Sequence, residues 1–147
     1  MSTKAEEFFK RYRYPDWLQT HSRVVGAIAE ALLAARHRGA AKIDSETVVL
    51  AAEGEGACVE LARRHAIYTV LDPDLAPRTA EEKLVYVADR RGGQSVETLE
   101  ARAQDTARRN PRYAAEIARA IPLAKAMERE VFADIAFGPD ELAEKAR

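Results

Sequence analysis

Three side chains that could together hold a metal ion are His21, His65 and Asp89, each on its own predicted helix. His21 stands four residues before Val25, and Asp89 stands four residues after Val85. Residues four apart share one face of an α-helix, so both side chains point towards the apolar interior. Imidazole and carboxylate groups suit a first-row divalent ion. Such an ion could lower the pKa of bound water and neutralise charge on a phosphoryl oxygen.

A purely structural interpretation of the same residues remains open. An inward-facing histidine is more often a hydrogen-bonded core residue than a metal ligand. Asp89 is followed by Arg90 and Arg91, with which it could form an ion pair at the end of a helix. A buried carboxylate is destabilising unless it is paired or bound to a cation, and either partner would satisfy Asp89.

The apolar pattern predicts an all-α fold, a compact bundle of six to seven helices without a convincing alternating strand. Thr79 and Glu82 form a capping box that begins one helix, and Pro122 is expected to kink the last long one. A polar tail, residues 138–147, has little to bury. The expected helices cover about residues 5–13, 15–38, 44–52, 57–65, 79–92, 95–110 and 111–135.

Length and composition predict one domain, residues 1–147, whose N-terminal helix lies within residues 1–15. The single cysteine, Cys58, excludes an internal disulfide and cannot build a thiolate metal site alone. The net charge of −1 gives no support to broad electrostatic capture of nucleic acid. Short basic clusters such as Arg90–Arg91 and Arg108–Arg109 are expected to be solvated helix faces. We find no apolar run long enough for a membrane span and no signal peptide, so we expect a cytoplasmic protein.

Four segments follow one another in an order that matches a known family. They are Thr20–Val25, Ile43–Ala52, Ala62–His65 and Thr79–Arg90, which together span most of the first two thirds of the chain. With these segments the sequence resembles the HD-domain superfamily of metal-dependent phosphohydrolases, and more closely its small bacterial branch of stand-alone domains. The resemblance implies an HD-like helical bundle, a divalent metal cofactor and hydrolysis of a small phosphate ester such as a nucleotide.

The resemblance also implies roles for individual side chains. His21 and Asp89 match metal ligands, and His65 matches a histidine that faces the metal or the substrate phosphate in some branches. Three basic residues would help to hold the site or offset the charge of the phosphate: Lys83, Arg23 and Arg90. His37 matches no motif and is expected at the surface.

The sequence departs from the family where its defining His-Asp dyad should stand. The dyad should follow Ala52, but the chain continues directly into Glu53–Ala57. The catalytic residues therefore cannot be named, and without the dyad we expect very weak metal binding and no turnover. Either the domain is degenerate, or the sequence lacks a segment between about Ala52 and Glu55 that carries the dyad. We favour the second explanation because both flanks match the family closely.

The rival interpretation is a non-catalytic, HD-like helical domain that binds a small molecule or a protein partner through the emptied cleft. In that case the end of the last long helix would offer a surface for a homodimer, through Phe132, Ile135 and Phe137.

Overall fold

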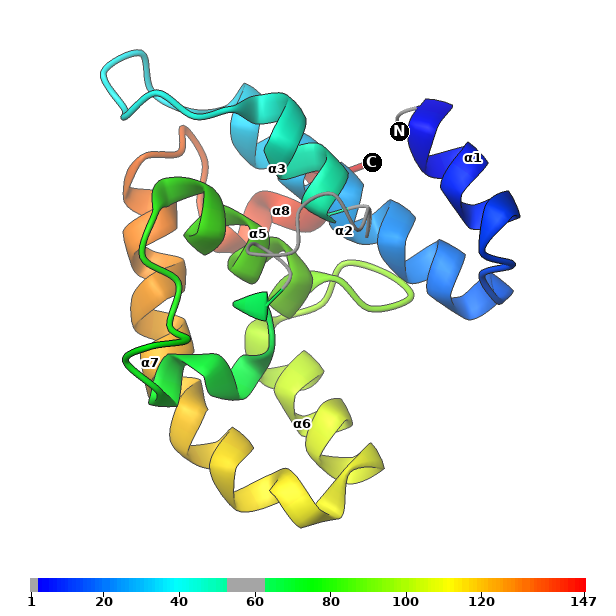
Figure 1. Cartoon of the computed structure of the whole chain (residues 1–147). Helices are drawn as coiled ribbons and strands as arrows, with labels where there is room; N and C mark the ends of the chain where they lie inside the picture. Colours follow the sequence, from blue (N-terminus) through cyan, green and yellow to red (C-terminus); the bar gives the residue numbers. More distant parts are fainter. Residues whose placement is uncertain (1–2, 53–62) are drawn as a thin grey trace.

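The chain folds as an all-α bundle in a computed structural model that describes residues 3–52 and 63–147 (Figure 1). Within these residues there are seven α-helices and no strand beyond two isolated bridge pairs. Short 3₁₀ helices, η2 to η4, join some of them. The α-helices are α1 (Thr3–Arg11), α2 (Asp16–Ala34), α3 (Ser45–Ala52), α5 (Ala80–Arg91), α6 (Leu99–Arg109), α7 (Ala114–Ala133) and α8 (Leu142–Lys145).

Helix α5 lies at the centre of the bundle and contacts α2, α3, α6 and α7. Its start is set by the predicted capping box: Thr79 accepts a hydrogen bond from the backbone of Glu82, whose carboxylate accepts one from the backbone of Thr79. Every residue from Leu84 to Arg91 is buried, the two arginines included. The expectation that Arg90–Arg91 forms a solvated face is therefore wrong, whereas Arg108–Arg109 is exposed as predicted.

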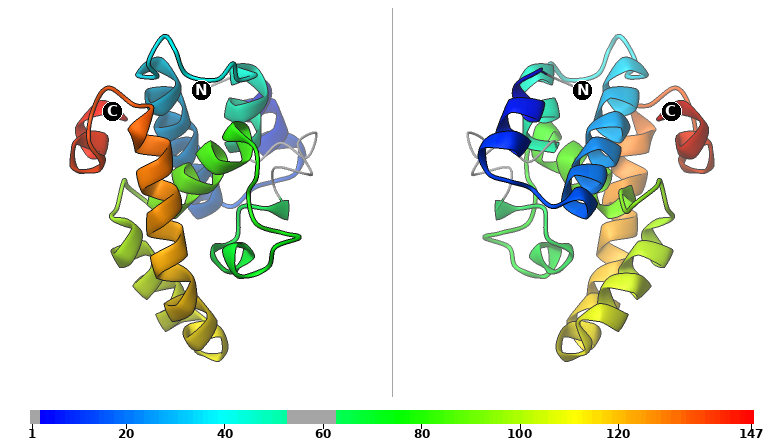
Figure 2. Two further views of the ribbon diagram at one scale, coloured as in Figure 1. Left: turned by 90° about the vertical axis from the view of Figure 1, so that its left-hand side faces the viewer. Right: turned by 90° about the vertical axis from the view of Figure 1, so that its right-hand side faces the viewer.

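Helices α6 and α7 run side by side and project beyond the rest of the bundle (Figure 2). A second, smaller cluster of buried side chains holds this projection to η2 (Ile67–Leu71): Ile67, Ala103, Ile117 and Ala120. Helix α7 follows η3 (Pro111–Tyr113) and runs on through Pro122 as one element. The segment between the helices expected over residues 57–65 and 79–92 thus contains a 3₁₀ helix that packs against α7.

Two helix boundaries differ from the expectation for local reasons. Helix α2 ends at Ala34 rather than Arg38, because the chain then pairs with the end of α7. The backbone N–H of His37 donates a hydrogen bond to Asp134 O at 2.9 Å. Helix α6 begins at Leu99 rather than Ser95, because Thr98 caps it by accepting a hydrogen bond from the backbone of Ala101. His37 itself is exposed, as predicted.

The C-terminal tail also differs from the expectation that it has little to bury. Its short helix α8 follows η4 (Pro139–Glu141) and places Leu142, which is fully buried, in the main core. Phe132 and Ile135 are buried in the same core, so they do not form the exposed surface imagined for a homodimer. Formation of a homodimer stays a prediction, but its interface would have to use other side chains.

No helix in residues 3–52 and 63–147 is long and apolar enough to cross a membrane. The helix expected over residues 57–65, with Cys58, lies largely outside the described residues. The junction after Ala52, where a segment that carries the His-Asp dyad would stand, also lies outside the described residues.

Gly92 allows the end of α5 to approach α2, and its replacement by alanine should push the two helices apart. A Cβ there would lie 2.5 Å from Val25 Cγ2 and 3.2 Å from Ala88 O. We expect Gly92→Ala to lower the free energy of unfolding by about 1–3 kcal/mol, as overpacked core positions do. Gly39→Ala is the control, since no atom lies within 4 Å of its Cβ position. Urea denaturation followed by circular dichroism measures both, and equal stabilities would contradict the close approach.

Candidate functional site

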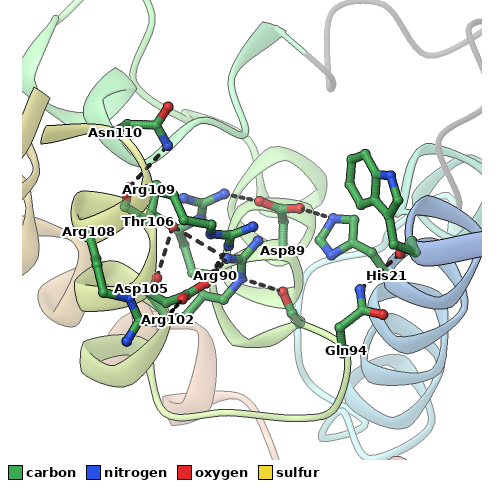
Figure 3. A network of polar contacts seen from close by, with 12 residues as sticks. His21, Asp89, Arg90, Gln94, Arg102, Asp105, Thr106, Arg108, Arg109 and Asn110 are labelled. Carbon is green, nitrogen blue, oxygen red and sulfur yellow. Dashed lines mark hydrogen bonds and ion pairs between the residues drawn. The ribbon is translucent and has the colours of Figure 1, made fainter. Parts of the chain in front are cut away.

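His21 on α2 and Asp89 on α5 meet although they are 68 residues apart in sequence (Figure 3). The His21 Nε2 atom lies 3.1 Å from Asp89 Oδ1, at hydrogen-bond distance. Both side chains are largely buried, with 19% and 10% of their surfaces exposed. The inward direction that helical spacing predicted for them is thus confirmed.

Asp89 Oδ2, the second carboxylate oxygen, has a different partner. The Nη2 group of Arg90 donates to it in a buried ion pair. The Arg90 guanidinium also lies 5.8 Å from the centre of the Tyr86 ring. The ion pair that the structural interpretation expected is therefore present, and it leaves Oδ1 to His21.

The charge of Asp89 is stabilised by these neighbours. Burial alone raises the pKa of the Asp89 carboxyl, but Arg90, the hydrogen bond with His21 and the nearby His65 outweigh it. The pKa is therefore held below the ordinary range for aspartate, and Asp89 is ionised at neutral pH.

His65 is brought towards Asp89 by the segment that leads into η2. The buried Tyr86 hydroxyl donates to Ile67 O at 3.1 Å, which ties η2 to α5. Thr69 Oγ1 donates to Ala66 O at 2.7 Å and so fixes the turn just after His65. Hydrogen bonds of two neighbouring elements thus set the position of His65.

His21, His65 and Asp89 line one cavity of about 160 Å³. Tyr14 lies on its wall, and burial followed by the nearby Tyr12 raises the pKa of the Tyr14 hydroxyl. The remaining wall is mostly apolar: Leu18, Ser22, Val25, Ala51, Ala52 and Val85. At about 30 Å³ per water molecule in the liquid, such a volume suits a small hydrated ion or one phosphate group.

The three predicted ligands share this cavity but do not form a complete metal centre. Within residues 3–52 and 63–147, no three His, Cys, Asp or Glu side chains gather closely enough to hold a metal ion. The His21–Asp89 pair is the part of the predicted set that is in direct contact. Residues 53–62, where the resemblance would imply further ligands, lie outside the described part.

Two of the three predicted phosphate contacts lie elsewhere. Lys83 Nζ pairs with Glu130 on α7. Arg23 Nη2 pairs with Glu6 on α1 at 3.1 Å and does not line the cavity of His21. Arg90, which contacts Asp89 directly, is the one of the three that belongs to the site.

A second cavity, of about 230 Å³, opens on the other side of His21, and sequence reasoning did not find it. Arg102, Asp105 and Arg109 of α6 line it together with Trp17. Arg102 Nε also donates to Gly92 O at 2.7 Å, which joins α6 to the end of α5 (Figure 3). The sequence did contain a signal for this cluster: the three residues are spaced by three and four positions, which places them on one helix face.

The chain matches no family model, no curated protein and no solved structure.

The depressed pKa of Asp89 predicts a pH-dependent contribution to stability. In metal-free buffer at pH 7, Asp89→Asn should lower the free energy of unfolding by about 3 kcal/mol, because Arg90 is left buried without its counter-charge. A carboxyl whose folded pKa is lowered stabilises the fold above its unfolded pKa, about 3.9 for aspartate. The difference between wild type and variant should therefore shrink as the pH falls below about 4.

Urea denaturation at pH 7 and pH 3 measures this difference. The exposed Asp134 supplies the control, and Asp134→Asn should change stability by less than about 0.5 kcal/mol. A difference for Asp89→Asn that stays constant with pH would show that its charge is not what stabilises the fold.

Proposed function

We propose that the cavity beside His21 and Asp89 binds a divalent metal ion, and that the protein is an HD-type phosphohydrolase acting on a small phosphate ester such as a nucleotide. The observation that carries this proposal is the convergence of His21, His65 and Asp89 on one cavity. They come from three segments that are far apart in sequence, and helical spacing together with the family resemblance singled out all three.

The His21–Asp89 pair fits a metal ion by its spacing. Two neighbouring ligands at about 2.1 Å from a six-coordinate ion are about 3.0 Å apart. The 3.1 Å between His21 Nε2 and Asp89 Oδ1 is close to that separation. A cation in place of the shared proton would therefore need little movement of either side chain.

The neighbouring residues support this arrangement without occupying it. Arg90 binds Asp89 Oδ2, so it orients the carboxylate and leaves Oδ1 directed at His21. Metal-binding carboxylates are commonly held by such outer hydrogen bonds. His65, which lines the same cavity, can contact either the ion or a phosphate oxygen. When bound, a divalent ion would supply a hydroxide from its water and neutralise charge on the phosphate.

Two protein ligands with water in the other positions bind a divalent ion weakly. The His-Asp dyad that the resemblance requires would raise both the ligand number and the affinity. Turnover therefore depends on a segment after Ala52 that carries the dyad.

One observation favours the rival function, a non-catalytic domain that binds a small molecule or protein partner. Both oxygens of Asp89 already have partners within the chain, Arg90 and His21, so the buried charge is neutralised without any ion. A domain that has lost its dyad would be stable in this form, with its cavity free for another ligand.

Binding of Mn²⁺, followed by electron paramagnetic resonance, tests the metal site. We expect weak binding to the wild-type protein and at least a tenfold loss of affinity in His21→Ala and Asp89→Ala. The matched control is His37→Ala, which removes an exposed histidine outside the cavity and should leave the affinity unchanged.

Circular dichroism of each variant separates loss of the ion from loss of the fold. Equal Mn²⁺ affinity in folded His21→Ala and wild type would contradict the metal site and favour the non-catalytic domain.

The intact mass of the purified protein separates the two accounts of the dyad. The enzyme proposal expects a mass clearly above the 16.3 kDa of the 147 residues, with a His-Asp pair located by peptide mapping after Ala52. A mass of 16.3 kDa would show that the dyad is lost and would support the non-catalytic domain.

A further inference from the structure

A third cavity, of about 230 Å³, lies beyond Asp89 between η2 and the α6–η3 turn. It is separate from the candidate metal cavity but shares His65 with it. Polar side chains from three elements line it, with two tyrosine rings: His65, Arg90, Thr106, Asn110, Tyr68 and Tyr113. This cavity takes no part in the proposed hydrolysis.

Two exposed aromatic rings stand on its wall. Tyr68 and Tyr113 are 49% and 41% exposed, and they are among the few large apolar side chains that the described chain leaves at its surface. Their ring centres lie 6.4 Å apart with the planes inclined by 33°. Rings that come from two separate elements and face one opening form a platform on which a flat ligand can stack.

A buried guanidinium supplies the polar part of the cavity. The Arg90 side chain is only 9% exposed, and its Nε atom has no hydrogen-bond partner among the described residues. A guanidinium carries five N–H groups, and Asp89 takes up one nitrogen, Nη2. A second cation, Arg112, lies 4.6 Å from the Tyr113 ring centre.

The charge of the lining favours an anion. None of the described residues that line this cavity carries a carboxylate, whereas Arg90 and His65 both belong to it. An oxyanion would therefore meet donors without a competing negative charge inside the cavity.

The volume limits the size of the ligand. A cavity of about 150 Å³ holds benzene, and pockets for drug-sized molecules begin at about 300 Å³. The 230 Å³ here suits one six-membered ring with one small charged group.

We infer that this cavity binds a monocyclic aromatic oxyanion, with the ring against Tyr68 and Tyr113 and the charged group directed to Arg90. The inference does not rest on the proposed hydrolase activity, because no metal ion takes part in the binding. The oxyanion can be a carboxylate or a phosphate, since both accept hydrogen bonds from a guanidinium.

Titration of the full chain with benzoate and with phenyl phosphate, in buffer containing EDTA, tests the inference by calorimetry. We expect at least one of the two to bind at least tenfold more tightly than both phenol and inorganic phosphate. Benzoate and phenyl phosphate distinguish a carboxylate from a phosphate as the natural group. Absence of binding by both at 10 mM would overturn the inference.

Leucine substitutions locate the site. Tyr68→Leu and Tyr113→Leu should each weaken binding of the aromatic probe at least fivefold, because they remove exposed rings without disturbing the core. Tyr12→Leu is the matched control, since Tyr12, just after α1, is 55% exposed and does not line the cavity. Unchanged affinity in both of the first two variants would overturn the inference. Use of EDTA keeps this result independent of the Mn²⁺ experiment.

Discussion

The structure depends on the pairing of charges at the buried end of α5. Asp89, Arg90 and Arg91 are all withdrawn from water, so each needs a partner inside the protein. Arg91 Nη1 donates to Glu128 of α7 at 2.7 Å, and its Nη2 donates to Pro139 O at 2.9 Å. Asp89 meets His21 of α2. These polar contacts fix the directions in which α2, α7 and the C-terminal segment approach the central helix.

Local signals were sufficient to predict most of the long helices, but they did not predict the burial of the end of α5. The capping box at Thr79 is contained within four residues, so the sequence alone could place the start of the helix. Two adjacent arginines, by contrast, normally indicate a solvated face, and Glu128, the partner of Arg91, lies 37 residues away. Leu142 could not be predicted to be buried for the same reason, because the core residues that cover it are far away in sequence.

Helical geometry also explains which site residues could be predicted. His21 and Asp89 lie in register with apolar neighbours, so their direction followed from the spacing. Lys83 precedes Asp89 by six residues, or about one and two-thirds turns, and therefore points to another side of α5. Arg23 follows His21 by two residues, more than half a turn, and faces away from it. Family resemblance named both residues, but the rotation of the helix separates them from the cavity.

Arg90 connects the two candidate binding sites. It holds one oxygen of Asp89 beside the metal cavity, and it lines the aromatic cavity on the other side. An oxyanion that draws on the Arg90 guanidinium would weaken its hold on Asp89, because the two anions share one cation. Arg90 would then neutralise less of the negative charge of Asp89, and the remaining charge favours a cation beside His21. Ligands of opposite charge in the two cavities would therefore assist each other's binding, since a coupling of this kind is reciprocal.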